Sequence, residues 1–230
     1  MRTITIAIDG FSSTGKSTLG RQLANYLDYV FVDSGAMYRA VTLYGLQKGF
    51  ISETGFDSEK LIASLTDISL EFVNNSEGIA EIHLNGENVE KEIRTLEISE
   101  YVSPVATLSE VRKKLVELQR KLGEGRGVVM DGRDIGTVVM PNADLKIFMN
   151  ASREVRAQRR YKELLNRGEN ISYEEVLENV TERDNIDSTR QLSPLKQADD
   201  AIVVDNSEMN ISDQFHMILQ LAKDRIVGRV

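Results

Sequence analysis

Short apolar runs alternate with longer stretches of helical periodicity along most of this chain. Continuous apolar runs are typical of strands that are buried on both faces, as the strands of a parallel sheet are. The stretches between them carry apolar residues at every third or fourth position, which predicts amphipathic helices. We predict strands at residues 4–8, 29–32, 127–130, 145–149 and 201–204, and helices at residues 18–27, 36–48, 108–122, 152–166, 173–187 and 211–226.

Residues 51–95 follow a different pattern. After a short helix predicted at residues 58–65, the segments 68–73 and 79–84 alternate apolar with polar residues, and Asn85-Gly86 is a hairpin-turn sequence. Alternation predicts strands with one face in water, as in an antiparallel sheet, rather than strands of a parallel core. We therefore expect a small antiparallel β insert within an otherwise α/β chain.

The order of these elements predicts the fold class. Strands that alternate with helices imply a parallel sheet with helices on both faces. With 230 residues and a hydrophobic content of 41%, the chain can bury one complete core. The sequence has no internal repeat and no low-complexity tract, so we expect residues 1–230 to form a single α/β domain.

Composition narrows the classes of function. The chain has no cysteine, which excludes disulfides, thiolate metal sites and a cysteine nucleophile. His83 and His216 are too far apart in the sequence to suggest a histidine metal cluster. A net charge of −8 argues against a nucleic-acid duplex as partner. No apolar run is long enough to span a membrane and no signal peptide is recognisable, so we expect a cytoplasmic monomer without a membrane partner.

The strongest chemical signal is the stretch from Gly10 to Ser17, which fits the phosphate-binding pattern G-x-x-x-x-G-K-[ST]. It lies between a predicted buried strand and a predicted helix, as this loop requires. Its two glycines let the backbone curl so that successive N–H groups face phosphate oxygens, and Lys16 adds a positive charge beside the helix N-terminus. Ser17 offers a hydroxyl to Mg²⁺. The sequence therefore predicts a nucleoside triphosphate site, and the alternative is a glycine-rich turn with a chance lysine.

A second group of candidates lies where other predicted strands end, which is where open α/β sheets bind ligands. Asp131 ends one strand as a Walker-B carboxylate does and can hold Mg²⁺ through water; otherwise it caps a tight turn. Arg133 is then suited to phosphate, with a surface ion pair as the alternative. Asp33-Ser34-Gly35 follows another strand as a predicted turn and helix N-cap, and Arg39 lies shortly after it.

Arginines are concentrated in the last third of the chain. Arginine favours flat, bidentate contacts with phosphate or carboxylate, so clustered arginines in an acidic chain suggest a small polyphosphate ligand. The alternative is a solvated helix face. One cluster comprises Arg153, Arg156, Arg159, Arg160 and Arg167. Arg183, Asp187 and Arg190 stand four and three residues apart, which places them on one face of a continuing helix, as a site or as an ion-pair ladder.

The phosphate-binding loop alone does not define a reaction. GTPase switches require N-K-x-D and D-x-x-G motifs, and neither occurs in this sequence. Motor and transporter ATPases need longer chains, so a small phosphotransferase fits the length best. The rival from another class is a module that senses a nucleotide without transferring phosphate, and arginines over a second, acceptor site argue against it.

Five blocks of the sequence resemble bacterial cytidylate kinases, in the family's order and over nearly the whole chain. The D-S-G-A-x-Y-R and D-G-R-D-x-G-T blocks are far more specific than the phosphate loop. Phe11 departs from the family, which often has proline there, and Ser13-Thr14 stand where smaller residues are common. Because the loop binds through backbone N–H groups, we expect phosphate binding to persist. The blocks are residues 10–18, 33–39, 92–95, 131–139 and 183–190.

The resemblance implies a kinase that moves the γ-phosphate of MgATP to CMP or dCMP. No covalent intermediate is needed, because the acceptor phosphate already carries a nucleophilic oxygen and catalysis consists of alignment and charge neutralisation. The implied catalytic residues are Lys16, Asp131, Arg133 and Arg183. The implied ATP site comprises Gly10, Phe11, Ser12, Ser13, Thr14, Gly15, Lys16, Ser17 and Thr18, with Arg156 and Arg160. The implied CMP site comprises Ser34, Arg39, Ser103, Arg112, Arg133, Asp134, Arg183, Asp187 and Arg190.

The resemblance also implies an architecture and a metal. The core is a P-loop kinase sheet, residues about 51–95 form the lobe that binds the nucleoside monophosphate, and residues about 152–168 form a helical lid. Mg²⁺ accompanies ATP, held by Ser17 and, through water, by Asp131. The alternatives are a kinase for another small acceptor, such as UMP or shikimate, or a nucleotide sensor without catalysis.

Overall fold

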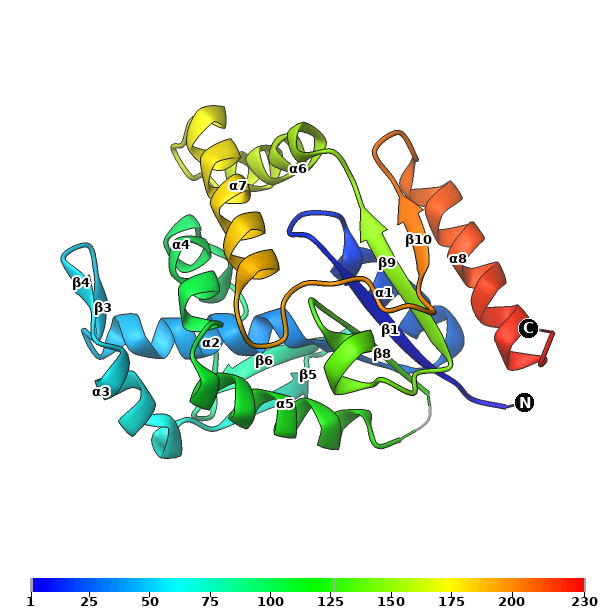
Figure 1. The fold of residues 1–230 in the computed structure, drawn as a ribbon, viewed down its shortest axis with the longest axis horizontal. Helices are drawn as coiled ribbons and strands as arrows, with labels where there is room; N and C mark the ends of the chain where they lie inside the picture. Colours follow the sequence, from blue (N-terminus) through cyan, green and yellow to red (C-terminus); the bar gives the residue numbers. More distant parts are fainter. Residues whose placement is uncertain (1, 126, 230) are drawn as a thin grey trace. The chain divides into compact units, whose positions relative to one another are not determined.

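The computed structural model of the chain describes residues 2–125 and 127–229. They divide into two compact units, which we call the sheet unit (residues 1–33 and 118–230) and the inserted unit (residues 34–117). The ribbon in Figure 1 labels the elements of both units. Among the described residues, the structure has no helix whose length and apolarity would let it cross a membrane.

The sheet unit is built on five parallel strands in the order β10-β9-β1-β8-β2. The sequence predicted all five, which confirms the α/β class. Their bounds are Thr5–Gly10 for β1, Val30–Asp33 for β2, Val128–Gly132 for β8, Leu145–Asn150 for β9 and Ile202–Asp205 for β10. Because β1 is central, the loop that follows it leaves the sheet between the ends of β8 and β9.

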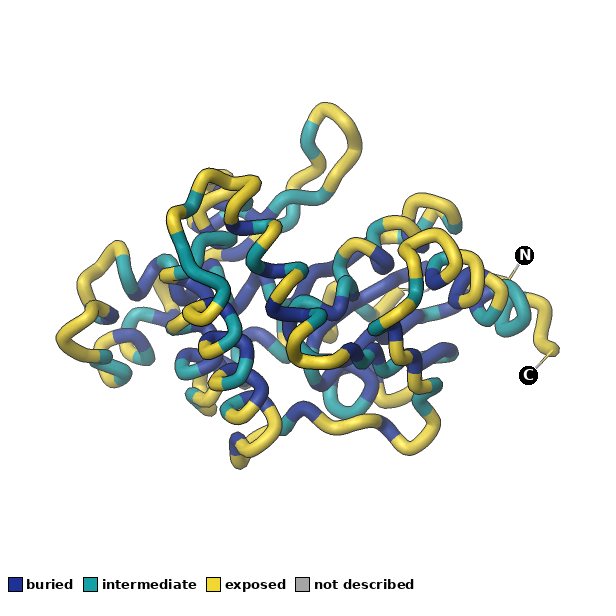
Figure 2. Tube along the Cα trace, turned by 90° about the horizontal axis from the view of Figure 1, so that it is seen from above, coloured by how far each residue is buried: buried dark blue, intermediate teal, exposed yellow. Residues whose placement is uncertain are grey.

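Helices α1 (Lys16–Leu27) and α8 (Ile211–Ile226) cover one face of the sheet. Ile6 and Ile8 of β1 pack there into one buried cluster with Leu23 of α1. In Figure 2 the central strands form the buried interior of the trace, while the loops and outer helix faces are exposed. Helices α6 (Arg153–Asn166) and α7 (Tyr173–Thr189) pack against each other. A capping box between Ser172 and Glu175 begins α7.

The opposite face of the sheet carries a feature that the sequence pattern did not predict, a π-helical turn, η3 (Ile135–Val139). Asp9 of β1 fixes it, since its two carboxylate oxygens accept hydrogen bonds from Ile135 N and Gly136 N, each at 2.7 Å. A Cβ on Gly136 would lie 3.2 Å from Asp9 Oδ2, so the tight approach favours glycine there. Helix α5 (Ser109–Gly123) contributes its last residues to this unit, and Arg120 donates to Val138 O.

The inserted unit combines helices with small antiparallel sheets, as the alternating pattern predicted. Strands β5, β6 and β7 form one sheet, and Asn85-Gly86 makes the turn between β6 and β7 with positive φ at both residues. The elements are α2 (Ser34–Gln47), β3 (Ile51–Ser52), β4 (Gly55–Phe56), α3 (Ser58–Ala63), η1 (Leu65–Asp67), β5 (Leu70–Asn74), β6 (Ala80–Leu84), β7 (Glu87–Asn88), η2 (Glu92–Arg94) and α4 (Leu96–Val105).

Two local expectations for the inserted unit were wrong. Asp33-Ser34-Gly35 is not a turn, because β2 ends at Asp33 and α2 begins at the next residue. Helix α4 was not predicted. Pro104, which is unusual in a helix interior, lies in its last turn. The buried Ile98, Val102 and Val105, spaced four and three apart, were the signal that could have revealed this helix.

Candidate active site

The loop between β1 and α1 has the conformation that its glycines permit. Gly10 has a φ of 148°, and a Cβ there would lie 2.1 Å from Met149 O of β9. Gly15 has a φ of 89° and directly precedes the first residue of α1. Ser13 also adopts a positive φ, 59°, at the apex of the loop. The backbone therefore curls around the start of α1, as the phosphate-binding pattern predicted.

Lys16 lies buried beneath this loop. Its Nζ donates to Phe11 O and, at 3.3 Å, to Thr14 Oγ1, while Thr14 Oγ1 itself donates to Phe11 O at 3.0 Å. Burial, and next the positive charge of Arg133, hold the pKa of Lys16 well below its usual value. A buried amine of this kind gains most from a ligand that brings negative charge.

Ser17 and Asp131 come together as the sequence predicted. Ser17 Oγ donates to Asp131 Oδ2 at 2.7 Å, joining the start of α1 to β8. The register of β2 with β8 places Asp33 opposite Asp131. Burial and the neighbouring Asp33 raise the pKa of Asp131 to about 7. Two buried carboxylates beside a serine hydroxyl form an oxygen-rich corner whose negative charge a divalent cation would relieve.

A network of charged side chains joins the end of β8 to the C-terminal part of α7. Arg133 Nε donates to Asp187 Oδ2 at 2.8 Å. Arg190 reaches the same carboxylate at 3.8 Å and the carboxylate of Asp134 at 3.7 Å. Burial alone would raise the pKa of Asp187, but Arg133 and the other nearby arginines lower it below its usual value. Asp187 is thus an ionised carboxylate that orients Arg133.

Arg183, one turn before Asp187 on α7, is a buried cation among cations. Burial first, and then the charge of Arg133, lower the pKa of Arg183 to about 10. The charge of Arg160 acts in the same direction. Positive charges held this close together are unfavourable unless an anion joins them, so the cluster is suited to phosphate groups.

Helix α6 brings its arginines to the phosphate-binding loop. Arg156 forms a bidentate pair with Asp184 of α7, at 2.9 and 2.6 Å, and also donates to Ala151 O at 3.0 Å and Ser12 O at 3.4 Å. Its guanidinium carbon lies 5.1 Å from the centre of the Phe11 ring, as a cation–π contact. Arg160 pairs with Glu163 at 3.0 Å. The two predicted lid arginines are thus already engaged by the protein in this structure.

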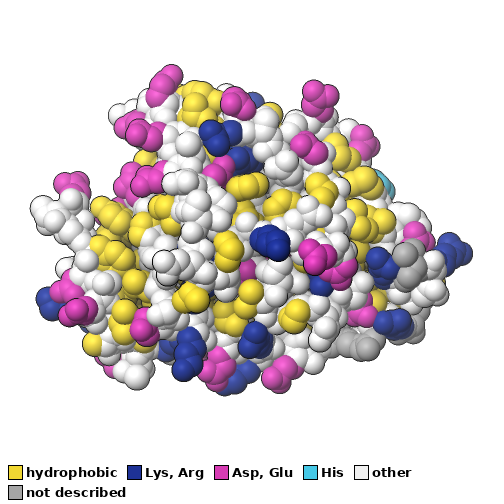
Figure 3. All heavy atoms as spheres, in the orientation of Figure 1, with side chains coloured by type: hydrophobic (Ala, Val, Ile, Leu, Met, Phe, Trp, Pro, Cys, Tyr) yellow, Lys and Arg dark blue, Asp and Glu magenta, His cyan; other side chains and the backbone are white. Residues whose placement is uncertain are grey.

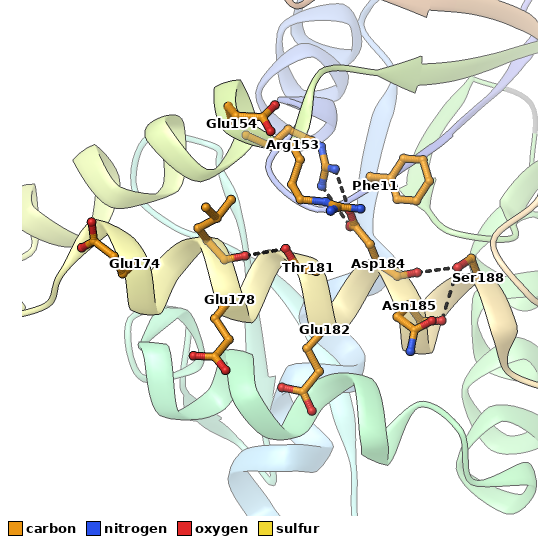
Figure 4. A pocket seen from close by; sticks show the side chains of 12 residues that line it. Phe11, Arg153, Glu154, Glu174, Glu178, Thr181, Glu182, Asp184, Asn185 and Ser188 are labelled. Atoms are coloured by element: carbon orange, nitrogen blue, oxygen red, sulfur yellow. Dashed lines mark hydrogen bonds and ion pairs between the residues drawn. The ribbon is translucent and has the colours of Figure 1, made fainter.

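Beside this pair lies a cavity of about 1150 Å³ between the loop, the start of α6 and one face of α7. Figure 4 shows Phe11 and the Arg153–Asp184 region at one end and Glu174, Glu178 and Glu182 along the α7 side. Carboxylates repel phosphate, so only the end near the loop suits a polyphosphate. On the molecular face drawn in Figure 3, acidic and basic side chains are interspersed.

The other predicted acceptor residues belong to the inserted unit. Arg39 of α2 donates to Ser99 Oγ of α4 at 3.2 Å and to Ile93 O at 3.4 Å. Arg112 of α5 lies over the Tyr38 ring, 5.6 Å from its centre, and donates to Ala106 O at 3.4 Å. These two arginines therefore have protein partners that hold them in place. Ser34 and Ser103 are both buried, at the start of α2 and in α4.

Three residues that sequence reasoning did not single out shape the site. Asp9 holds η3, Asp184 pairs with Arg156, and Asn206 contacts the phosphate-binding loop from the far end of the chain. Asp9 directly precedes Gly10 of the loop, and this position could have identified it from the sequence as a residue near the site. Asn206 carries no such signal, because its partner Thr14 lies 192 residues earlier.

Comparison with known proteins identifies relatives over nearly the whole chain. The sequence profile of the cytidylate kinase family matches residues 6–224. The cytidylate kinase of Flavobacterium johnsoniae is 61% identical over 97% of this chain and 98% of its own length. That of Phocaeicola vulgatus is 57% identical over 93% of this chain and 94% of its own length. An uncharacterised protein from Eubacterium ventriosum shares the fold, with a TM-score of 0.51, 11% identity and coverage of 97% and 99%.

Proposed function

The chain belongs to the cytidylate kinase family, and on that premise we propose which of its residues transfer the γ-phosphate of ATP to CMP or dCMP. The observation that carries the proposal is that, within the sheet unit, Lys16 of the phosphate-binding loop lies close enough to Arg133 and Arg183 for their charges to lower its pKa, while Asp187 pairs with Arg133. A loop that binds one polyphosphate and a separate cluster of cations together fit two phosphate-bearing ligands.

We assign the donor to the loop of residues 10–18. Its N–H groups and the start of α1 would bind the β- and γ-phosphates, and Lys16 would exchange Phe11 O for a phosphate oxygen. Such an exchange replaces a neutral acceptor by a charged one, which strengthens the hydrogen bond. Arg156 and Arg160 would join the triphosphate from α6 as the lid closes over it.

Ser17 and Asp131 fit a magnesium ion. Their oxygens lie 2.7 Å apart, and the pKa of Asp131, raised by burial and by Asp33, indicates negative charge that a cation would stabilise. Mg²⁺ is usually bound by one or two protein oxygens together with substrate phosphates. When bound, the ion supplies charge neutralisation at the transferred phosphate. Asp131 would hold it through water and Ser17 directly.

We assign the acceptor phosphate to Arg133 and Arg183. Arg133 is oriented by Asp187, and Arg183 is the buried cation whose lowered pKa reflects burial and repulsion from Arg133. An incoming phosphate would relieve that repulsion. In the transfer itself the acceptor oxygen attacks in line, and the negative charge that spreads over the moving group is stabilised by Lys16, Arg133 and Arg183. No covalent intermediate with the protein is needed.

We assign the cytidine part of the acceptor to the polar side chains that the family resemblance implies. Cytosine shows an amino donor at N4 and acceptors at N3 and O2, whereas uracil shows an acceptor at O4 and a donor at N3. Asp134 and Ser103 can accept from the amino group, and Arg112 carries donors for N3 and O2. Arg190 would join these groups around the cytosine. Ser34 and Arg39 would hold the sugar–phosphate end, and Asp187 would lie near the ribose.

A panel of acceptors tests the assignment. Release of ADP from MgATP is measured with CMP, dCMP, UMP, AMP, GMP and shikimate, each at the same concentration. We expect CMP and dCMP to give the highest kcat/KM. A higher value for UMP or shikimate would mean that the acceptor site reads another molecule, and ATP binding with no transfer to any acceptor would indicate a nucleotide sensor.

We also propose that the protein acts as a monomer in the cytoplasm. A chain without cysteine needs no oxidising compartment to fold. Light scattering coupled to size-exclusion chromatography tests the oligomeric state: a mass near 25.8 kDa supports the proposal, and twice that mass contradicts it.

A further inference from the structure

Asn206, in the turn after β10, is tied to four other elements by its polar atoms, and its backbone N–H donates to Asn150 O of β9 at 2.9 Å. It is 1% exposed. Its Nδ2 donates to Thr14 O of the phosphate-binding loop at 2.7 Å and to Gln214 Oε1 of α8 at 2.5 Å. Arg159 of α6 donates to Asn206 Oδ1 at 2.9 Å and to Asn206 O at 2.8 Å. Both amide hydrogens and the side-chain oxygen of Asn206 are therefore used.

The bond to Thr14 O determines which way one loop N–H points. In a trans peptide, the carbonyl and the N–H that follows it lie in one plane and point in opposite directions. The structure contains no cis peptide among its described residues. Asn206 holds Thr14 O on the side of α8, so the N–H of Gly15 is held on the opposite side. Gly15, with its φ of 89°, allows this orientation without strain.

The other loop carbonyls are fixed in the same manner but by different groups. Phe11 O accepts from Thr14 Oγ1 and Lys16, and Ser12 O accepts from Arg156. Asn206 belongs neither to the loop nor to α6. Its hydrogen bond acts on the peptide between Thr14 and Gly15, directly before α1. Its contribution is therefore separable from those of Lys16 and Arg156 by substitution.

We propose that Asn206 is a positioning residue for the donor nucleotide: it aims the Gly15 N–H toward the phosphates and, through Arg159, couples α6 to the loop. The inference rests on the proposed assignment of ATP to this loop. Asn206 itself touches no reacting atom in this account; it acts through Thr14 and Gly15. Its loss should weaken ATP binding while leaving acceptor binding almost unchanged.

Asn206→Asp is the sharpest test, because it keeps the shape of the side chain and removes both donors. Thr14 O would then face a carboxylate oxygen and lose its hydrogen bond. If the Thr14–Gly15 peptide needs that bond to bind ATP, one unpaired buried carbonyl corresponds to about a 5-fold to 100-fold loss of affinity for ATP. The Kd of a non-hydrolysable ATP analogue, measured by calorimetry, should rise by at least about 5-fold. The KM for CMP should change less than about 2-fold.

Asn210→Asp is the matched control. It makes the same chemical change in the same turn, at the exposed N-cap of α8, where Asn210 accepts from Asp213 N at 2.8 Å. The substitution also removes the hydrogen bond that Asn210 Nδ2 donates to Asp213 Oδ2 at 2.6 Å and brings two exposed carboxylates together there. Aspartate still caps helices as well as asparagine does, so α8 should persist and analogue binding should match the wild type. A folded Asn206→Asp protein that binds the analogue within about 2-fold of the wild type would overturn the proposal. Equal losses in both variants would do the same, since they would indicate general loosening of α8.

Arg159→Met keeps the proposal testable if Asn206→Asp does not fold. It removes the donors to Asn206 and leaves the contacts of Asn206 with Thr14 and Gln214 in place, so a rise of about 2-fold to 5-fold in the analogue Kd is expected. Amide hydrogen exchange should also speed up in residues 10–17 but not in residues 5–9. Unchanged exchange in the loop would contradict the coupling. Because analogue binding needs no acceptor, these results stand apart from the question of whether CMP is phosphorylated.

Discussion

At the scale of single residues, this protein keeps most of its functional charge inside. Lys16 and Arg183 are buried, Arg133 is partly buried, and burial is the first cause of the lowered pKa of both Lys16 and Arg183. In a low-dielectric setting each charge acts more strongly on a bound phosphate than it would at the surface. The phosphates of a nucleotide would bring negative charge to these cations.

Removing the loop lysine tests this view. Lys16→Ala should lower kcat by about 100-fold or more, because a preorganised charge on the transferred phosphate is lost. The fold should persist, since Phe11 O keeps its hydrogen bond from Thr14 Oγ1. Steady-state kinetics with CMP, beside circular dichroism and the exposed control Lys196→Ala, measure both effects. A folded Lys16→Ala enzyme within a few-fold of wild-type turnover would contradict the assignment.

Asp9 gives a prediction about pH. Burial raises its pKa to about 6, even though the N–H groups of Gly136 and Ile135 favour the ionised form. Between about pH 4 and pH 6 the folded protein therefore holds a proton at Asp9 that the unfolded chain has released. Stability from this group is complete below pH 4 and falls as pH rises to 6.

The measurement compares the free energy of unfolding of the wild type and of Asp9→Ala in urea across this range. From pH 4 to pH 7, the free energy of unfolding of the wild type should fall, relative to that of Asp9→Ala, by an amount on the order of 3 kcal/mol. Most of the change should lie below pH 6. A constant difference would show that Asp9 titrates normally in the folded state.

Arg112 gives a prediction about base choice. Arg112→Met keeps an unbranched apolar stem and removes the donors, so CMP should lose roughly 5-fold to 100-fold in kcat/KM and UMP less. The KM for ATP should barely change. Lys113→Met, at an exposed position of the same helix, is the control and should behave like the wild type. Equal losses for CMP and UMP would mean that Arg112, through Tyr38 and Ala106, supports the fold or a phosphate and does not read the base.

At the scale of elements, α6 is anchored along its first half. Arg156 binds α7 and the phosphate-binding loop, and Arg159 binds Asn206. In the later part of the proposed lid, most of residues 165–169 are exposed to solvent. A lid that closes over ATP would therefore move most in its second half.

Hydrogen exchange tests this expectation. Amide exchange in residues 152–168 should slow when both nucleotides, or a bisubstrate analogue, are bound, with the larger change after residue 160. The central strand β1 serves as the internal reference. Exchange that stays the same throughout residues 152–168 at saturation would remove the lid assignment.

The elements also show what the sequence could and could not predict. Buried parallel strands and long amphipathic helices were predicted because one local period defines each of them. Helix α4 was missed although its apolar residues have helical spacing, and η3 was missed because Asp9, on a distant strand, holds it. Resemblance to known kinases supplied the residue roles; it did not supply Asn206, whose role depends on a contact between the two ends of the chain.

At the scale of the whole molecule, the residues assigned to ATP all belong to the sheet unit. We predict that the enzyme binds ATP readily but reacts only when the acceptor is present. Without the acceptor, water is the competing nucleophile, and a kinase must keep its hydrolysis slow.

The most direct test of the account measures the release of ADP from MgATP by the wild-type protein, with and without saturating CMP, while CDP is quantified in the same samples. We predict that CMP raises the rate of ADP release by about 100-fold or more, which is the scale of acceleration expected from a correctly oriented acceptor. Each ADP should be matched by one CDP. Equal rates with and without CMP, or ADP without CDP, would contradict phosphoryl transfer to cytidylate.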